Sequence, residues 1–348
     1  MITDLDSKWF VDYNYDFIDS ITNKPIGTLR IPCFLYHDNK PVDSRNILRN
    51  AVNTFKETLW NIFDTNPEIL NYSNRKRMAM KKIVNSIYDI YSEKLPKSFD
   101  GVKIVMLSDL HDNVYGISLE KLYRMIEEQQ PEFVIVAGDL LTRKHSDGSD
   151  EVVALLKRLA DKYPVFFANG NHETKVKIYT EKYGDRYDRL MDALKSAGVK
   201  ILNNKHIDYR KNGEIIHIYG LEIDKDFFLI RNRPKMEDDY ISSVIGEKID
   251  GFGILIAHNP MYFEQYAAWG ADLVFSGHVH GGIIRLPFVG GVLNPDYSLF
   301  PHYDGGMFDK EKSVMLLGRG LGTHTINVRI NNPPELVTAV LHTKERNG

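Results

Sequence analysis

Two side chains that could bind a metal follow a short apolar segment in the first half of the chain. Residues 102–111 read Val-Lys-Ile-Val-Met-Leu-Ser-Asp-Leu-His, so Asp109 and His111 come directly after a β-branched apolar run. Such a run is typical of a buried strand, and ligands gather at the carboxyl ends of strands in open α/β sheets. Carboxylate and imidazole groups both bind metals. From these residues alone, a metal pair and a solvated strand end are equally supported.

Four further apolar runs, at 133–137, 165–168, 254–257 and 273–276, also end in side chains that can bind a metal. In chain order these side chains are Asp139, then Asn171 with His172, then His258, and finally His278 with His280. Two divalent cations about 3.5–4 Å apart need a bridging oxygen ligand and terminal nitrogen and oxygen donors, and this set contains all of them. A single histidine on such a strand would more simply be structural. The complete set therefore predicts a metal centre that no single member predicts.

These blocks resemble the calcineurin-like metallophosphoesterase superfamily, whose pattern is Asp-x-His, Gly-Asp, Gly-Asn-His-Asp/Glu, a lone His and Gly-His-x-His. Each block occurs here in family order, between residues 96 and 341. The flanking segments 95–101, 281–288 and 319–322 resemble a bacterial branch of often membrane-anchored phosphoesterases, which includes enzymes that act on UDP-diacylglucosamine. The resemblance implies an α/β fold, a four-layer α-β-β-α sandwich, here with an additional mixed N-terminal region.

The resemblance also implies a role for each motif residue. One metal would be held by Asp109, His111 and His280, the other by Asn171, His258 and His278, and Asp139 would bridge them. The metals would lower the pKa of a bridging water to give hydroxide near neutral pH. His172 would be catalytic, facing the substrate and stabilising the transition state or protonating the leaving oxygen. Imidazole and carboxylate ligands suit manganese, iron and zinc, and we expect manganese.

Some residues near the motifs keep two interpretations. The protein Ser/Thr phosphatases carry a second aspartate after Gly-Asp that segment 140–144 lacks, which disfavours a protein phosphatase. Glu173 either orients His172 or is structural. Arg143 either contacts a phosphate or is solvated, and His302 either lines the site or lies outside it.

The region before the motifs is predicted to be separate from them, with a boundary between residues 95 and 96. Its patterns predict strands at 11–17 and 26–31, then helices at 44–63 and 79–90. We expect residues 96–348 to form the phosphoesterase domain. Residues 1–95 could cap the site, mediate dimerisation or contact a membrane. The basic cluster of Arg75, Lys76, Arg77, Lys81 and Lys82 is either a membrane contact or a solvated helix face.

Strands alternate with helices after the boundary, as in βαβ units. Helices are expected at 118–130, capped by Ser118, near 152–159 and at 187–197. Asn212-Gly213 between two apolar runs predicts a β-hairpin. The polar segment 224–250 is either a lid over the site or an ordinary surface excursion.

Composition limits the choice of function. The chain has 348 residues and a formal net charge of −3, which disfavours nucleic acid as a partner. Cys33 is the single cysteine, so no internal disulfide forms, and we expect a cytoplasmic protein, at most peripheral to a membrane. We therefore predict a dinuclear phosphoesterase acting on a small phosphorylated substrate, such as a nucleotide or a lipid-linked phosphate. A non-catalytic scaffold on the same fold and a nuclease are the alternatives.

Overall fold

Two compact units make up the chain, Met1–Met78 and Ala79–Gly348. The computed structural model describes residues 2–5, 8–18, 25–34, 82–113, 116–142, 149–229, 233–282, 284–286, 290–293, 301–323, 329 and 332–344. Among the helices of these ranges, none has the length and apolar character needed to span a bilayer.

The first unit contains an antiparallel three-stranded sheet in the order β1-β2-β3. Its strands are β1 (Ile2–Leu5), β2 (Lys8–Ile18) and β3 (Pro25–Phe34). The two predicted strands are confirmed as parts of β2 and β3, and β1 was not predicted. The helix predicted at 44–63 lies outside the described residues.

The segment predicted as a helix at 79–90 is instead mostly a strand, β4 (Val84–Ser92), which pairs in parallel with β17 (Glu335–Thr343). Ile83, Ile87 and Ile90 are spaced like one face of a helix, but Ile87 is 57% exposed while the other two are buried. A partner strand near the other end of the chain decides this conformation, and local spacing cannot report such a partner. β4 therefore belongs to the second unit, Ala79–Gly348.

The first of two six-stranded sheets in the second unit has the order β4-β17-β5-β6-β7-β8. Its remaining strands are β5 (Lys103–Leu107), β6 (Phe133–Ala137), β7 (Val165–Ala168) and β8 (Lys200–Ile201), which run parallel to one another. The connecting α-helices are α3 (Leu119–Gln129), α4 (Ser149–Ala160), α5 (Asn171–Ile178), α6 (Thr180–Tyr183) and α7 (Arg186–Ser196). The helices predicted at 118–130, near 152–159 and at 187–197 are confirmed, and the Ser118 hydroxyl caps α3 by accepting the Lys121 N–H at 3.2 Å.

The second sheet has the order β15-β16-β12-β11-β10-β9. Its strands are β9 (Lys205–Lys211), β10 (Glu214–Leu221), β11 (Gly253–Ala257), β12 (Leu273–Ser276), β15 (Gly306–Lys310) and β16 (Ser313–Leu317). Helices α8 (Tyr240–Ile245) and α9 (Phe263–Trp269) pack on it, and β13 (Ile284–Leu286) pairs with β14 (Gly290–Leu293) in a separate hairpin. Asn212 and Gly213 both have positive φ between β9 and β10, so the predicted hairpin is confirmed.

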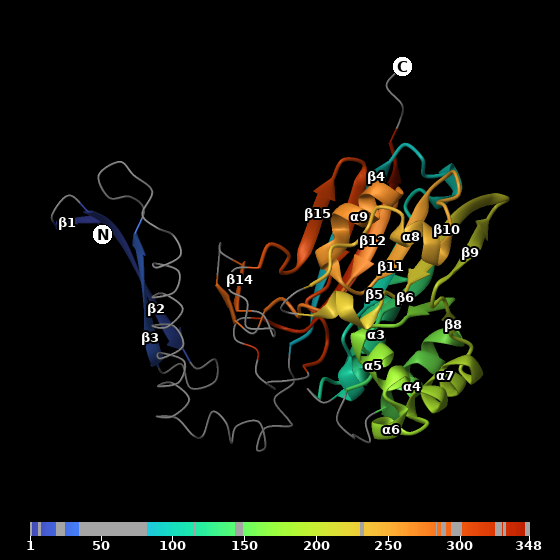
Figure 1. The fold of residues 1–348 in the computed structure, drawn as a ribbon, viewed down its shortest axis with the longest axis horizontal. Coiled ribbons are helices and arrows are strands. Elements are labelled where there is room, and N and C mark those ends of the chain that lie inside the picture. Colours follow the sequence, from blue (N-terminus) through green and yellow to red (C-terminus); the bar gives the residue numbers. More distant parts are fainter. Residues whose placement is uncertain are drawn as a thin grey trace. The chain divides into compact units, whose positions relative to one another are not determined.

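Alternating side chains divide the core into layers. On β5, Ile104 and Met106 enter the core between the two sheets, whereas Val105 and Leu107 enter the core under α3, α4 and α7. β11 alternates in the same way between the inter-sheet core and the core under α8 and α9. Figure 1 shows α3 to α7 grouped beside β5 and β6, with α8 and α9 beside β11 and β12. The predicted four-layer α-β-β-α sandwich is confirmed.

Candidate metal centre

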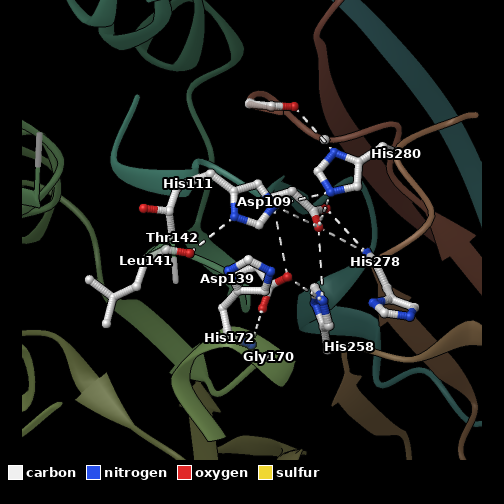
Figure 2. Close-up of polar contacts among 12 residues, drawn as sticks. Asp109, His111, Asp139, Leu141, Thr142, Gly170, His172, His258, His278 and His280 are labelled. Carbon is white, nitrogen blue, oxygen red and sulfur yellow. Dashed lines mark hydrogen bonds and ion pairs between the residues drawn. The ribbon is translucent and has the colours of Figure 1, made fainter. Parts of the chain in front are cut away.

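The predicted ligands all lie just beyond the carboxyl ends of five strands, and Figure 2 shows most of their side chains facing one another. Asp109 and His111 follow β5, Asp139 follows β6, Asn171 and His172 begin α5 after β7, His258 follows β11, and His278 and His280 follow β12. All of them are buried except His278, which is partly exposed. The two sheets therefore bring together residues that the sequence spreads over 172 positions, from 109 to 280.

Three donor atoms converge at one end of the centre. Asp109 Oδ1 lies 3.9 Å from His111 Nε2 and 3.4 Å from His280 Nε2. The two imidazole nitrogens are 3.1 Å apart. One oxygen and two nitrogens within such a short range are the donors that a transition metal prefers.

A second group of donors consists of Asp139, His258 and His278, whose atoms all lie within 4.8 Å of one another. His258 Nε2 lies 3.2 Å from Asp139 Oδ2 and 3.8 Å from Asp109 Oδ1. Asp139 also forms a group with His111 and His172. The second and third groups therefore share Asp139, and the third shares His111 with the first.

Among the described residues, Asn171 Oδ1 is buried in this region without a hydrogen-bond partner, and His258 Nε2 faces only the carboxylates of the centre. Leaving a buried polar atom without a partner costs about 1–3 kcal/mol. An amide oxygen and an imidazole nitrogen are both metal donors, so the residues present fit a divalent metal centre.

Backbone strain is concentrated at the ligands. Asp109, His111, Asp139, His278 and His280 all have φ between 49° and 78°, in the left-handed region that L-residues seldom adopt. Such residues cluster at functional sites, where the surrounding structure fixes them. The positive φ values therefore agree with the donor chemistry in pointing to these strand ends as a candidate site.

The absence of a side chain at Gly170 lets two ligand loops approach closely. A Cβ atom there would lie 2.2 Å from Asp139 Oδ1. The same is true of Gly277, where a Cβ atom would lie 2.6 Å from Asp109 Oδ2. In both cases the anion that the glycine approaches is a carboxylate of the centre itself.

Burial and neighbouring charges shift the pKa values of the ligands in opposite directions. Burial raises the pKa of Asp109 to about 6, and the Asp139 charge adds to the rise. Burial also opposes ionisation of Asp139, but His258, His172 and His111 outweigh it and hold the pKa well below its usual range. Burial would lower the pKa of His258, yet the two aspartates raise it to about 10. Positive charge is therefore stabilised between the carboxylates, as a site for a cation requires.

Backbone carbonyl groups orient three of the histidines. In each ring, Nδ1 contacts a carbonyl oxygen, so Nε2 is the nitrogen that points into the centre. The pairs are His111 with Leu141 at 3.0 Å, His258 with Ala137 at 2.6 Å and His280 with Gly322 at 3.2 Å.

Glu173 ties two ligand loops together through its carboxylate. Oε2 accepts the backbone N–H groups of Asp139 at 2.8 Å and Gly170 at 2.9 Å, and Oε1 accepts that of Leu141 at 2.8 Å. Burial, with the Asp139 charge, raises the pKa of Glu173 to about 7. These contacts support the structural interpretation of Glu173.

Sequence reasoning missed several residues that support the ligands. Asp112, Arg186 and Thr142 form a buried hydrogen-bonded cluster beside His111. Arg329 donates to the carbonyls of Arg319, Gly320 and Gly322, and the last of these also contacts His280. Asp112 could have been noticed as an extra carboxylate next to a ligand, but Arg186 and Arg329 lie in no motif.

Other candidate residues have different outcomes. His302 is exposed and packs on Tyr303, with ring centroids 4.5 Å apart, and it belongs to none of the donor groups in the described residues. Arg143 lies outside those residues. Within the segment predicted as a lid or a surface excursion, the Phe228 ring lies 5.3 Å from that of His278 and 6.3 Å from that of His258. Part of this segment therefore borders the centre.

Comparison with known proteins gives the same family as the motifs. The profile of the calcineurin-like phosphoesterases matches residues 102–282, more than half of the chain. The metallophosphoesterase YkuE of Bacillus subtilis (strain 168) is 28% identical over 279 residues, covering 78% of this chain and 89% of YkuE. The UDP-2,3-diacylglucosamine pyrophosphatase LpxG of Chlamydia muridarum is 25% identical over 287 residues, covering 70% of this chain and 85% of LpxG.

Among solved structures, TT1561 of Thermus thermophilus matches with a TM-score of 0.40 and 11% identity, covering 62% of this chain and 88% of that chain. The resemblance seen in the motifs is confirmed by the profile match. The chain belongs to the calcineurin-like phosphoesterase family and is a hydrolase of phosphoester bonds.

Proposed function

We propose that this protein is a dinuclear metal-dependent phosphoesterase that cleaves a phosphomonoester, phosphodiester or pyrophosphate bond. One metal would be held by Asp109, His111 and His280, the other by Asn171, His258 and His278, and Asp139 would contact both. The position of Asp139 carries this proposal: its Oδ2 lies 3.8 Å from His111 Nε2 of the first set and 3.2 Å from His258 Nε2 of the second, and two neighbouring cations require such a shared carboxylate.

The protein's own residues prepare the centre for reaction. Two divalent ions would polarise the phosphoryl oxygens and activate water, and we propose manganese, with iron or zinc as the alternatives. Glu173 and the glycines hold the ligand loops in place, so the donors need little rearrangement. Carbonyl contacts at Nδ1 keep His111, His258 and His280 in the form that presents Nε2.

His172 is proposed as the catalytic residue that stabilises the transition state or protonates the leaving oxygen. Its ring centroid lies 4.6 Å from that of His111, and its backbone N–H donates to Asp139 Oδ1 at 2.8 Å. Because His172 also forms a donor group with His111 and Asp139, a ligand role is the competing interpretation.

Replacing His172 distinguishes these two roles. His172→Ala should retain two manganese ions per chain, measured by elemental analysis, while kcat falls by about 100- to 10,000-fold, as for loss of a general acid. A variant that binds only one manganese ion would make His172 a ligand. His206→Ala, at a histidine outside the donor groups that packs on Tyr219, is the control.

The substrate is proposed to be a small phosphorylated compound, either a nucleotide or a lipid-linked phosphate. LpxG, the relative described above, is a pyrophosphatase of UDP-2,3-diacylglucosamine, which supports including pyrophosphate bonds. The single cysteine suits a reducing compartment, so we place the protein in the cytoplasm, with peripheral membrane contact through the basic cluster at 75–82 as the alternative.

The test of the proposed function is the Asp139→Ala variant. Wild type should bind two manganese ions per chain and hydrolyse a chromogenic phosphate ester. The variant should lose turnover by about 1,000-fold or more, because metal polarisation is worth several kcal/mol and each 1.36 kcal/mol is a factor of ten. Circular dichroism should show that it remains folded. Equal turnover by both proteins would contradict the mechanism.

The two alternative functions have their own signatures. Two bound metals without turnover of any mono-, di- or pyrophosphate compound would favour a scaffold on this fold. Cleavage of DNA or RNA would favour a nuclease, although the net charge of −3 disfavours that partner.

A further inference from the structure

A buried carboxylate lies next to His111 but belongs to none of the donor groups in the described residues. Asp112 is 2% exposed, and its Oδ2 accepts the backbone N–H and the hydroxyl of Thr142 at 2.8 and 2.7 Å. Its own backbone N–H donates to the Leu140 carbonyl at 2.7 Å. Asp112 therefore ties the loop after β5 to the loop after β6.

Arg186, the first residue of α7, hydrogen-bonds to both Asp112 and Thr142 and belongs to none of the sequence motifs. Its Nη2 donates to Asp112 Oδ2 at 2.7 Å, and its Nη1 donates to the Thr142 carbonyl at 2.7 Å. The Arg186 side chain is 9% exposed, and its rigid guanidinium contacts both partners. We call Asp112, Thr142 and Arg186 the Arg186 cluster.

The Arg186 cluster is connected to His111 in two ways, through the neighbouring residue Asp112 and through the loop that contains Leu141 and Thr142. The ring of His111 contacts the carbonyl of Leu141 at 3.0 Å, and Leu141 is the residue before Thr142. His111 and Asp112 have φ of 49° and 52°, a strained conformation that the surroundings must maintain. The cluster therefore fixes both the backbone of His111 and the carbonyl that orients its ring.

Stability alone does not account for such a cluster. A buried ion pair is often no more stabilising than apolar side chains of similar volume, because both charges must be desolvated. Its directional contacts can instead specify one geometry, which a ligand such as His111 needs.

We propose that Arg186 is a positioning residue for His111, acting through Asp112 and Thr142, and that it sets the affinity for the metal held by Asp109, His111 and His280. This inference rests on the proposed dinuclear function. It extends the metal centre to a helix that carries none of the motifs.

The test measures manganese binding by titration calorimetry of the full chain. Wild type should show two binding events. Asp112→Asn and Arg186→Lys should each weaken one event by about 10- to 100-fold, the usual cost of losing a residue that supports a metal ligand, and leave the other event unchanged. Lysine keeps the charge at 186 but cannot make both contacts.

Asp272→Asn is the matched control for the loss of a buried, ion-paired carboxylate. Asp272 is 5% exposed, pairs with Lys94 at 3.0 Å and Lys248 at 3.2 Å, and accepts the Gly253 N–H at 2.8 Å. It precedes β12, at the opposite end of that strand from the metal centre. This variant should lower the unfolding temperature and leave both manganese events unchanged.

A double variant covers the case in which a single variant does not fold. Asp112→Asn combined with Arg186→Leu leaves no buried unpaired charge, so it should recover stability while still binding one manganese ion weakly. If all these variants bound both manganese ions with wild-type affinity, the positioning role of Arg186 would be wrong and the proposed function would still stand. A wild-type chain that binds fewer than two manganese ions would overturn the proposed function and this inference together.

Discussion

The two sheets contribute different chemistry to the metal centre. Loops of the first sheet carry both carboxylates and the amide, at Asp109, Asp139 and Asn171. Loops after β11 and β12 of the second sheet contribute only histidines, at 258, 278 and 280. The negative charge thus comes from one edge and most of the imidazoles from the other, and a complete donor group forms where the edges meet.

The ligands are also supported differently in the two sheets. In the first sheet, buried charged side chains hold the loops, namely Glu173 and the Arg186 cluster. In the second sheet, Nδ1 of His258 and of His280 contacts a backbone carbonyl. The carbonyl that His258 contacts is that of Ala137, in β6 of the first sheet. The centre therefore depends on the packing of one sheet against the other.

The largest effect expected from this comparison is the loss of one histidine from each sheet. His111→Ala and His258→Ala should each retain one manganese ion per chain by elemental analysis. Turnover should fall by about 100- to 1,000-fold in both, because each removes a metal worth several kcal/mol of charge stabilisation.

His217→Ala is the matched control, because His217 is buried and hydrogen-bonded to Asp208 at 2.8 Å but lies outside the donor groups. It should retain both manganese ions. If His111→Ala or His258→Ala retained two manganese ions, the assignment of that histidine as a metal ligand would be wrong.

A smaller effect is expected from adding one methyl group at the meeting point of the loops. Gly170→Ala should destabilise the fold by about 1–3 kcal/mol, as overpacking does, and weaken manganese binding, because its Cβ would displace Asp139. Denaturant unfolding and calorimetry measure the two effects.

Gly253→Ala makes the same substitution where the neighbour can move. Its Cβ would lie 2.7 Å from Lys248 Cε, in a flexible side chain, so the change should be smaller and leave manganese binding intact. Equal metal affinity in wild type and Gly170→Ala would show that this close approach is unnecessary.

The gathering of the candidate donor residues at one place could be predicted because each motif is local. An apolar run followed by a carboxylate or imidazole needs only a few adjacent residues, and the structure gathers all of the predicted side chains at the same strand ends. The roles assigned to individual ligands remain predictions.

Other features could not be predicted because their partners are distant in the sequence. β4 has the isoleucine spacing of a helix, yet it is a strand because β17 pairs with it. Arg186 is an ordinary residue of an amphipathic helix until the fold brings it to Asp112.

The sequence by itself determined the family, the candidate donor residues and the alternation of strands and helices after residue 96, since these depend on residue types at short spacing. Only the tertiary structure decided that carboxylates and histidines from two sheets lie together in one candidate centre, and that Arg186 pairs with Asp112 next to His111. These contacts depend on long-range packing. A buried charged group is costly unless it is paired, and its partners here are distant in the sequence.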